Sequence, residues 1–270
     1  MMAQQSIFEI IIEACLRKGG GKGVSGFKMN EDLLKEAAEV IRRADYFIAL
    51  TGAGISKESN VPTFRGPDGL WRNYDAMQLA TPSAFTRNPS LVWEWYTWRQ
   101  ELIEKCSPNP AHITIADWEK QGLLKTLITQ NVDGLHVRAG SVNVYEVHGD
   151  IWAVRCTSCE YHGRLHKPAA GIPLCPLCSN YLRPDVVWFG ESLNSTIMGR
   201  VYEELKQADV CIVIGTSALV QPAASFPIVV KQRQGKIIEV NIEQTLLTPV
   251  ADCHLKGKAG EILPALDELI

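Results

Sequence analysis

The 270-residue sequence has no apolar run near the roughly 20 residues that a membrane-spanning helix needs, so we expect no membrane span. It has little excess of either charge, because 27 basic and 30 acidic residues leave a net charge of −3. We therefore predict no direct binding to nucleic acid, which a sequence-wide basic field would favour. Residues 6–16 are apolar, but the basic segment follows them instead of preceding them, unlike a secretory signal. The sequence favours a cytoplasmic globular protein.

The eight cysteines are not spread as in a disulfide framework. Four of them form two close pairs, Cys156-Thr-Ser-Cys159 and Cys175-Pro-Leu-Cys178, with fifteen residues between the pairs. This spacing is typical of a tetrahedral zinc site with four thiolates. Four thiolates leave no position open for a substrate, so we expect one structural zinc ion. Buried free cysteines, disulfides or iron in place of zinc are the alternatives.

Short runs rich in Val, Ile and Leu alternate with helical patterns, which favours an α/β fold with a doubly wound parallel sheet. The predicted strands are Tyr46–Leu50, Leu123–Thr129, Val142–Val147, Asp185–Phe189, Val210–Gly215 and Lys236–Asn241. A first helix is predicted after Asn30, which can cap it, and others at 91–105, 109–121, 196–208 and 222–234. We interpret residues 66–122 and 152–184 as insertions, and the glycine-rich residues 17–28 as a linker.

Glycine-rich or polar turns follow several predicted strands. The first, Thr51-Gly-Ala-Gly-Ile-Ser, can approach a phosphate, but Lys57 replaces the third glycine of the dinucleotide fingerprint. This departure argues against an ordinary dehydrogenase. The other turns are 129–136 (TQNVDGLH), His148-Gly149, 215–217 (GTS) and 241–243 (NIE). Each could be a plain turn or a structural histidine, and we interpret His112 and His254 as structural. At the carboxyl ends of parallel strands, however, such turns would surround one crevice.

The motifs GAGIS, PTFRG, TQNVDGLH, HG, the four cysteines, GTS and VNIE occur in the order found in sirtuins, the NAD-dependent protein-lysine deacylases, which the sequence therefore resembles. The resemblance covers about residues 30–268 and leaves an N-terminal extension at 1–28. It implies a catalytic domain at 29–270 with a Rossmann-like NAD-binding core at 29–65, 123–151 and 185–270. A helical insertion at 66–122 and a zinc module at 152–184 would form a small zinc-ribbon and helical domain.

The resemblance also implies a role for individual residues. The residues that would bind NAD are Gly52, Ala53, Gly54, Ser56, Thr63, Phe64, Arg65, Trp71, Gln130, Asn131, Asp133, Gly215, Thr216, Ser217, Asn241, Glu243 and Ala259. His148 would be the catalytic base, with Asn131 and Asp133 beside the reacting ribose. An acylated peptide would add as a strand between two segments that contain Val187, Phe189, Gly190, Glu191 and Val220. The acyl oxygen would attack the ribose as nicotinamide leaves, and His148 would then activate a ribose hydroxyl.

One predicted helix, at residues 91–105, indicates which acyl groups the protein removes. Tyr96 and Arg99 are three residues apart and share a helix face. They match the Tyr-x-x-Arg pair by which desuccinylase-type sirtuins bind the acyl carboxylate, and Ala76 matches the small residue that makes room. Arginine offers a two-pronged fit to a carboxylate. The resemblance thus implies desuccinylation or demalonylation beside deacetylation; the alternative is that the aromatic residues pack and Arg99 is solvated.

Two other activities are compatible with the same motifs. One is ADP-ribosyl transfer or NAD hydrolysis on the same fold, and the other is a non-catalytic sensor of NAD or peptide. The presence of Asn131, Asp133 and His148 together favours deacylation over a sensor. Nicotinamide release that depends on an acylated peptide would separate deacylation from the first alternative.

Overall fold

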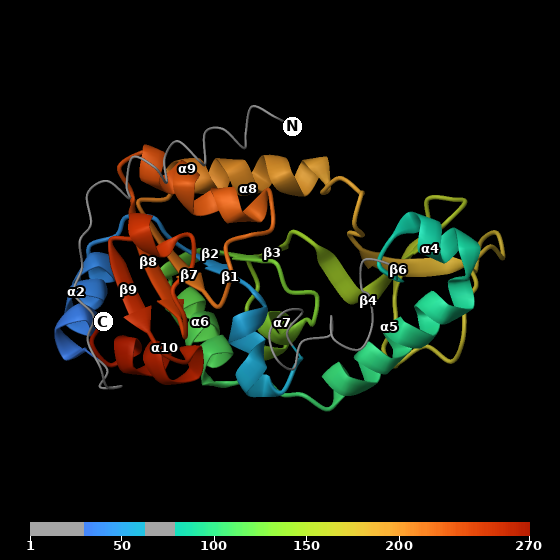
Figure 1. Cartoon of the computed structure of the whole chain (residues 1–270), viewed down its shortest axis with the longest axis horizontal. Coiled ribbons are helices and arrows are strands. Elements are labelled where there is room, and N and C mark those ends of the chain that lie inside the picture. Colours follow the sequence, from blue (N-terminus) through green and yellow to red (C-terminus); the bar gives the residue numbers. More distant parts are fainter. Residues whose placement is uncertain (1–29, 63–78) are drawn as a thin grey trace.

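A six-stranded parallel sheet forms the centre of the larger domain in the computed structural model, which describes residues 30–62 and 79–270 (Figure 1). The strand order is β3-β2-β1-β7-β8-β9. The strands are β1 (Phe47–Thr51), β2 (Leu124–Thr129), β3 (Val144–Glu146), β7 (Val210–Ile214), β8 (Lys236–Asn241) and β9 (Cys253–Lys256). Every residue of β1 and β7 is buried, as expected for strands that helices cover on both faces.

Helices cover both faces of this sheet. One face packs against α2 (Glu31–Arg42), α6 (Pro110–Lys120) and α10 (Ala259–Asp267), and the other against α8 (Ser195–Gln207) and α9 (Phe226–Gln232). In β1, Phe47 and Ala49 belong to the first core, and Ile48 and Leu50 to the second. The predicted doubly wound sheet is confirmed. So is the cap of α2, because Asn30 Oδ1 accepts the Asp32 N–H at 3.1 Å.

A smaller domain holds a three-stranded antiparallel sheet in the order β5-β4-β6. Its strands are β4 (Gly149–Cys156), β5 (His162–Arg164) and β6 (Leu182–Val186), and its helices are α4 (Pro82–Arg87) and α5 (Pro89–Glu104). Side chains of α5 such as Trp93 and of the sheet such as Ile151 share one core. Helices α4 and α5 of the first predicted insertion therefore pack with the sheet of the second one (Figure 1). Helix α6, which also lies within 66–122, packs on the large sheet instead. The shorter elements are η1 (Ala53–Ser59), α7 (Leu135–Ala139), η3 (Ala223–Ser225) and η4 (Thr248–Val250).

The strand predicted at Asp185–Phe189 for the parallel sheet is wrong. The chain is extended at β6, which pairs antiparallel with β4 and not with the large sheet. Pro184 lies in this strand and has no N–H to donate, which suits an edge strand but not the interior of a sheet. The short edge strand β9 was not predicted, and the strand expected at 142–147 is limited to β3.

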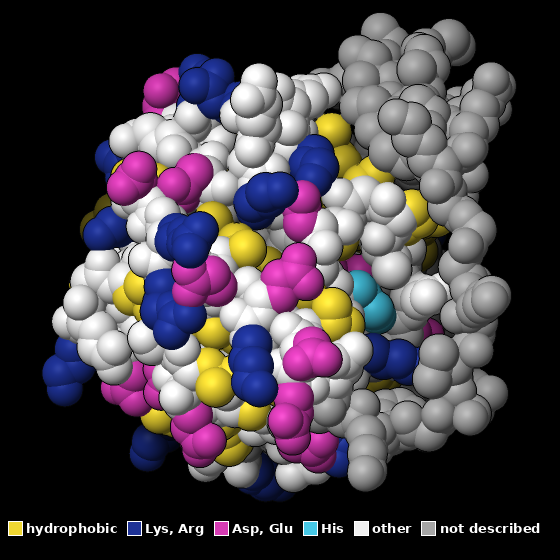
Figure 2. All heavy atoms as spheres, turned by 90° about the vertical axis from the view of Figure 1, so that its left-hand side faces the viewer, with side chains coloured by type: hydrophobic (Ala, Val, Ile, Leu, Met, Phe, Trp, Pro, Cys, Tyr) yellow, Lys and Arg dark blue, Asp and Glu magenta, His cyan; other side chains and the backbone are white. Residues whose placement is uncertain are grey.

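Charges of both signs are interspersed on the face that carries α2, β9 and α10 (Figure 2). This pattern is typical of a solvated surface and provides no single-sign field there. Among the described residues, no helix is both long and apolar enough to cross a bilayer.

Candidate active site

The chain order of the parallel sheet reverses between β1 and β7. Thr51, at the end of β1, lies in register with Thr129 of β2 and Ile214 of β7. The turns that start at Gly52 and Gly215 therefore lie side by side at the carboxyl edge of the sheet. Open α/β sheets bind ligands in the crevice at such a switch point. Gly52, Gln130, Gly215 and Asn241, which the resemblance assigned to the dinucleotide, lie at this edge.

The glycines of the first turn let two stretches of backbone approach each other. The Gly54 N–H donates to the Gly215 carbonyl at 2.8 Å. A Cβ on Gly54 would lie 2.7 Å from the Gly215 Cα, and one on Gly52 would lie 2.8 Å from the Thr216 Cβ. Gly215 has a φ of +61°, which favours glycine. From the sequence, we explained Gly52 and Gly54 by the approach of a phosphate. In the structure, both positions need glycine because the second turn lies too close to leave room for a Cβ.

Thr216 joins polar groups from the ends of two other strands, β2 and β8. Gln130 Nε2 donates to Thr216 Oγ1 at 3.1 Å, and Asn241 Nδ2 donates to the Thr216 carbonyl at 2.8 Å. These bonds fix both amides at the crevice edge. Of the other predicted residues, Ser217 and Glu243 are exposed, Ala53 begins η1, and Ala259 is buried at the start of α10.

Ser56 is the centre of a buried polar cluster on the other side of the first turn. Its hydroxyl donates to Asp133 Oδ2 at 2.8 Å and accepts from Asn131 Nδ2 at 3.0 Å. His112 Nε2 lies 3.3 Å from the same oxygen. Because His112 Nδ1 accepts the Asn109 N–H, its Nε2 carries the proton and donates to Ser56. The Ser56 hydroxyl thus uses its one proton and both lone pairs within the protein, so it orients Asn131 and Asp133.

Asp133 is a buried carboxyl group, 4% exposed. Burial raises its pKa, and the hydrogen bonds from the Leu135 N–H and from Ser56 oppose that shift. The positive charge of Arg99 opposes it as well. Both carboxyl oxygens accept hydrogen bonds, since Oδ1 takes the Leu135 N–H at 2.9 Å. Asp133 is therefore held rigidly, and the charge of Arg99 reaches it.

Two buried histidines, His112 and His136, also belong to this cluster, and the sequence analysis gave neither of them a role at the site. His136 Nε2 lies 2.9 Å from Thr51 Oγ1, and its ring centroid is 4.8 Å from that of His112. Burial lowers the pKa of His112 to about 4, and it also keeps the pKa of His136 low. Both rings are therefore neutral near pH 7. The sequence analysis interpreted His112 as structural, and no local signal joins it to Ser56, because the two residues lie far apart along the chain.

His148 follows β3 at the same edge. Its Nδ1 lies 3.1 Å from the Gln130 carbonyl, which can only accept, so Nδ1 carries the proton. Nε2 is then the proton acceptor that a general base needs. Burial lowers the pKa of His148, although the bond to Gln130 opposes this shift. Near neutral pH the ring is therefore mostly in its basic form.

The segment 187–191 runs beside His148. The Val187 N–H donates to the His148 carbonyl at 2.9 Å, and the Phe189 N–H donates to the Ala80 carbonyl at 2.9 Å. Phe189 is 40% exposed, and Val220, which belongs to the other segment of the predicted clamp, is 38% exposed. Gly190 has a φ of +87°, a left-handed conformation that favours glycine and ends the extended stretch.

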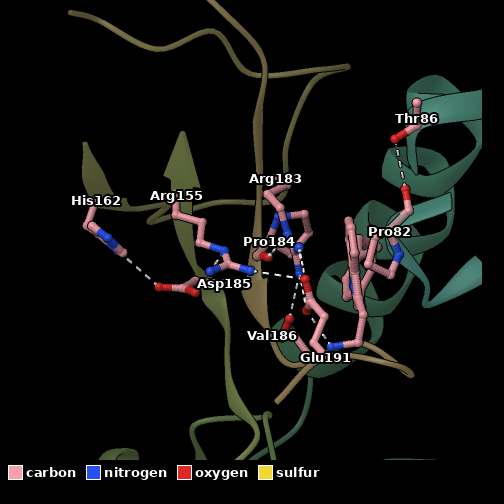
Figure 3. Close-up of polar contacts among 11 residues, drawn as sticks. Pro82, Thr86, Arg155, His162, Arg183, Pro184, Asp185, Val186 and Glu191 are labelled. Carbon is pink, nitrogen blue, oxygen red and sulfur yellow. Dashed lines mark hydrogen bonds and ion pairs between the residues drawn. The ribbon is translucent and has the colours of Figure 1, made fainter. Parts of the chain in front are cut away.

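Glu191, which the resemblance assigned to the substrate, has intramolecular partners for its carboxylate. Its carboxylate forms ion pairs with Arg183 and Arg155, and it accepts the Trp188 N–H at 2.8 Å (Figure 3). The basic groups and these hydrogen bonds hold the pKa of Glu191 below its usual range, against the effect of burial. The Glu191 side chain is thus occupied by the protein and fixes the segment from behind.

Helix α5 brings Tyr96 and Arg99 together in the interior. They are 0% and 6% exposed, so the alternative of a solvated Arg99 is wrong. The guanidinium carbon of Arg99 lies 4.8 Å from the centroid of the Trp95 ring and 5.6 Å from that of Tyr96. These contacts place a buried cation against the aromatic rings of α5, and its positive charge acts on Asp133 of the Ser56 cluster.

The four predicted zinc ligands lie together at one end of the small sheet. The Sγ atoms of Cys156, Cys159, Cys175 and Cys178 are all within 4.8 Å of one another. Three of the pairs are 3.5 Å apart, close to the edge of about 3.8 Å that a tetrahedron with Zn–S bonds of about 2.3 Å has. The cluster is placed to hold a zinc ion. Five predicted residues, Thr63, Phe64, Arg65, Trp71 and Ala76, lie outside the described residues.

Comparisons with known proteins place these features in one family. A family model described as "Sir2 family" matches residues 52–222. A relative from Pyrococcus furiosus, named NAD-dependent protein deacylase, is 51% identical over 245 residues, which are 88% of this chain and 98% of the relative. NAD-dependent protein deacylase 1 of Archaeoglobus fulgidus is 52% identical over 244 residues, covering 90% and 97% of the two chains.

Solved structures agree with the sequence relatives. A Sir2 homologue mutant in complex with ADP-ribose superposes with a TM-score of 0.85 at 51% identity, covering 89% of this chain and 96% of that one. The structure of Sir2Af2 bound to a myristoylated histone peptide has a TM-score of 0.74 at 36% identity, covering 89% and 97%.

Proposed function

Since the chain belongs to the Sir2 family and its relatives are NAD-dependent protein deacylases, we propose that it transfers the acyl group of an acyl-lysine to ADP-ribose. Nicotinamide and the free lysine are the other products. The observation that carries this proposal is the convergence of Asn131, Asp133 and His148 at the sheet edge where the two glycine turns meet. In open α/β sheets a dinucleotide binds in such a switch-point crevice.

The residues at this edge fit NAD by their chemistry. The first turn, with Gly52, Ala53 and Gly54, and the second turn, with Thr216, would hold the dinucleotide. The amides fixed on Thr216, from Gln130 and Asn241, suit hydroxyl and amide partners. When bound, NAD supplies a ribose carbon that becomes electrophilic as nicotinamide departs. The carboxylate of Asp133 and the amide of Asn131 would orient and stabilise that developing positive charge.

His148 is proposed as the general base. Its Nδ1 is tied to the Gln130 carbonyl, so Nε2 would take the proton of a ribose hydroxyl. His148→Ala is expected to retain NAD binding and to lose turnover, measured as nicotinamide release with an acyl-lysine peptide. Nicotinamide release that continues at the same rate without the acyl peptide would instead support NAD hydrolysis. Binding without any turnover in the wild type would support a sensor.

The substrate peptide is proposed to add as a strand beside 187–190. Three consecutive N–H groups of this segment, those of Val187, Trp188 and Phe189, already donate within the protein. The peptide N–H groups would therefore donate to carbonyls of the segment. The exposed side chains of Phe189 and Val220 would cover the aliphatic part of the substrate lysine. Val187 connects the segment to the backbone of His148, which supports a substrate position near the base.

The acyl group is proposed to be succinyl or malonyl in addition to acetyl. The buried cation of Arg99 beside the Tyr96 ring supports this, because a carboxylate on the acyl chain would be matched there by charge and by a hydroxyl donor. The test is kcat/KM for acetyl-lysine and succinyl-lysine versions of one peptide. Arg99→Met should lose the succinyl preference, whereas Arg87→Met, an exposed arginine of α4, should keep it. An Arg99→Met variant with an unchanged preference would contradict the assignment.

A further inference from the structure

A hydrogen bond joins the segment 187–191 to helix α5, which carries Tyr96 and Arg99. Trp188 Nε1 lies 2.8 Å from the Tyr96 hydroxyl oxygen, and both residues are buried, at 2% and 0% exposure. An indole N–H can only donate, so the tyrosine oxygen is the acceptor. The proton of the Tyr96 hydroxyl is therefore directed away from Trp188.

That proton has no acceptor within residues 30–62 and 79–270, where Trp188 is the hydrogen-bond partner of the hydroxyl. Burial raises the pKa of Tyr96, so the phenol stays protonated and remains a donor. A buried hydroxyl proton without an acceptor is costly. A substrate that brings a negative oxygen would supply the acceptor, next to the buried guanidinium of Arg99.

The indole of Trp188 is itself held in place. The guanidinium carbon of Arg183 lies 3.3 Å from the centroid of its ring, and the Phe85 ring is 5.4 Å away. Arg183 Nη2 donates to Glu191 Oε2 at 3.0 Å, and Glu191 also accepts the Trp188 backbone N–H. Figure 3 shows Arg183 and Glu191 facing each other, with Arg155 reaching the same carboxylate from the neighbouring strand. A rotation that moved the indole N–H away from Tyr96 would disturb the contacts of the ring with Arg183 and Phe85.

We propose that Trp188 is a positioning residue that selects carboxyl-bearing acyl groups by fixing the Tyr96 hydroxyl as a proton donor to the acyl carboxylate. This inference rests on the proposed function, because it requires that the acyl carboxylate lies beside Tyr96 and Arg99. Trp188 does not touch the reacting atoms. It acts through the orientation of one hydroxyl, and its effect should therefore follow the charge of the acyl group.

The test compares the ratio of kcat/KM for succinyl-lysine to kcat/KM for acetyl-lysine peptides in three variants. Trp188→Phe keeps a ring between Arg183 and Phe85 but removes the N–H, and it should lower the ratio about tenfold, mainly through the KM of the succinyl peptide. Tyr96→Phe should lower the ratio at least as much. Trp118→Phe is the matched control, because it also removes a buried indole N–H, which donates to Asp267 Oδ1 at 2.7 Å in the large domain, away from Tyr96 and Arg99. That variant should keep the ratio within about twofold.

A double-mutant cycle decides whether Trp188 acts through Tyr96. In the double variant Trp188→Phe with Tyr96→Phe, the ratio should fall no further than in Tyr96→Phe alone. Additive losses would overturn the inference, and so would equal losses for both acyl groups in Trp188→Phe, which would indicate a structural role. A wild type without succinyl preference would overturn the acyl assignment itself. A wild-type preference that Arg99→Met abolishes and Trp188→Phe leaves intact would overturn only the role of Trp188.

Discussion

The buried ring of His112 makes a specific prediction about stability in acid. His112 is 0% exposed, and both ring nitrogens are used in the neutral form, by the Asn109 N–H and by the Ser56 hydroxyl. Burial lowers its pKa from 6.5 to about 4. Between these two values the unfolded chain binds the proton and the native chain does not. Stability is therefore lost as the pH falls from about 6.5 towards 4.

The size of the stability loss follows from the pKa shift of His112. A difference of about 2.5 pH units corresponds to about 3 kcal/mol when it is fully developed. Between pH 7.5 and pH 5, where only part of the window is crossed, His112 should account for about 2 kcal/mol. His112→Gln offers an amide that can donate to Ser56 but does not titrate. Its stability should therefore fall less steeply with acid than that of the wild type.

The assay is urea unfolding of the wild type and His112→Gln at pH 7.5 and pH 5, followed by a fluorescence signal of the tryptophans. Acid-sensitive groups away from His112, such as the cysteine cluster, are the same in both proteins and cancel in the difference. The wild type should lose about 2 kcal/mol more than the variant between the two pH values. Equal losses would show that His112 titrates normally in the native state and would refute the reasoning.

Three further predictions concern the glycine turns, the cysteine cluster and the base. Gly54→Ala should destabilise the protein by about 1–3 kcal/mol and weaken NAD binding at least tenfold in calorimetry, because its Cβ would lie 2.7 Å from Gly215. Gly199→Ala in α8, where nothing lies within 4 Å of the added Cβ, should do neither. A strong chelator should release about one zinc per chain and lower the melting temperature, whereas a chain stable without metal would contradict a structural ion. The acid limb of the pH profile of kcat/KM should have its midpoint below pH 6.5, because the pKa of His148 is lowered and activity is lost as its ring gains a proton. A midpoint above pH 6.5 would exclude His148 as the base.

Local patterns in the sequence sufficed for much of the fold. Asn30 and the acidic residues after it predicted the start of α2, and apolar runs predicted five of the parallel strands. The same pattern failed at 185–189, because an apolar run is compatible with either sheet and does not reveal its partner strand. There the decisive features are Pro184 and the pairing with β4, and pairing between segments distant in sequence leaves no periodic signal.

For the site, too, some features could be predicted from local sequence patterns and others could not. The spacing of the cysteines predicted their cluster, since the geometry of a metal site is encoded in short loops. The turns at the strand ends predicted where Asn131, Asp133 and His148 meet. The parts that could not be predicted depend on tertiary contacts: His112 reaches Ser56 from another helix, and the Glu191 carboxylate is paired with Arg183.

The most direct test of the proposed activity is to identify the acyl product of a reaction with NAD and a succinyl-lysine peptide by mass spectrometry. The account predicts O-succinyl-ADP-ribose in equal amounts with nicotinamide and the deacylated peptide. Free succinate with NAD left intact, or an ADP-ribosylated peptide that keeps its acyl group, would contradict the transfer of the acyl group to ADP-ribose.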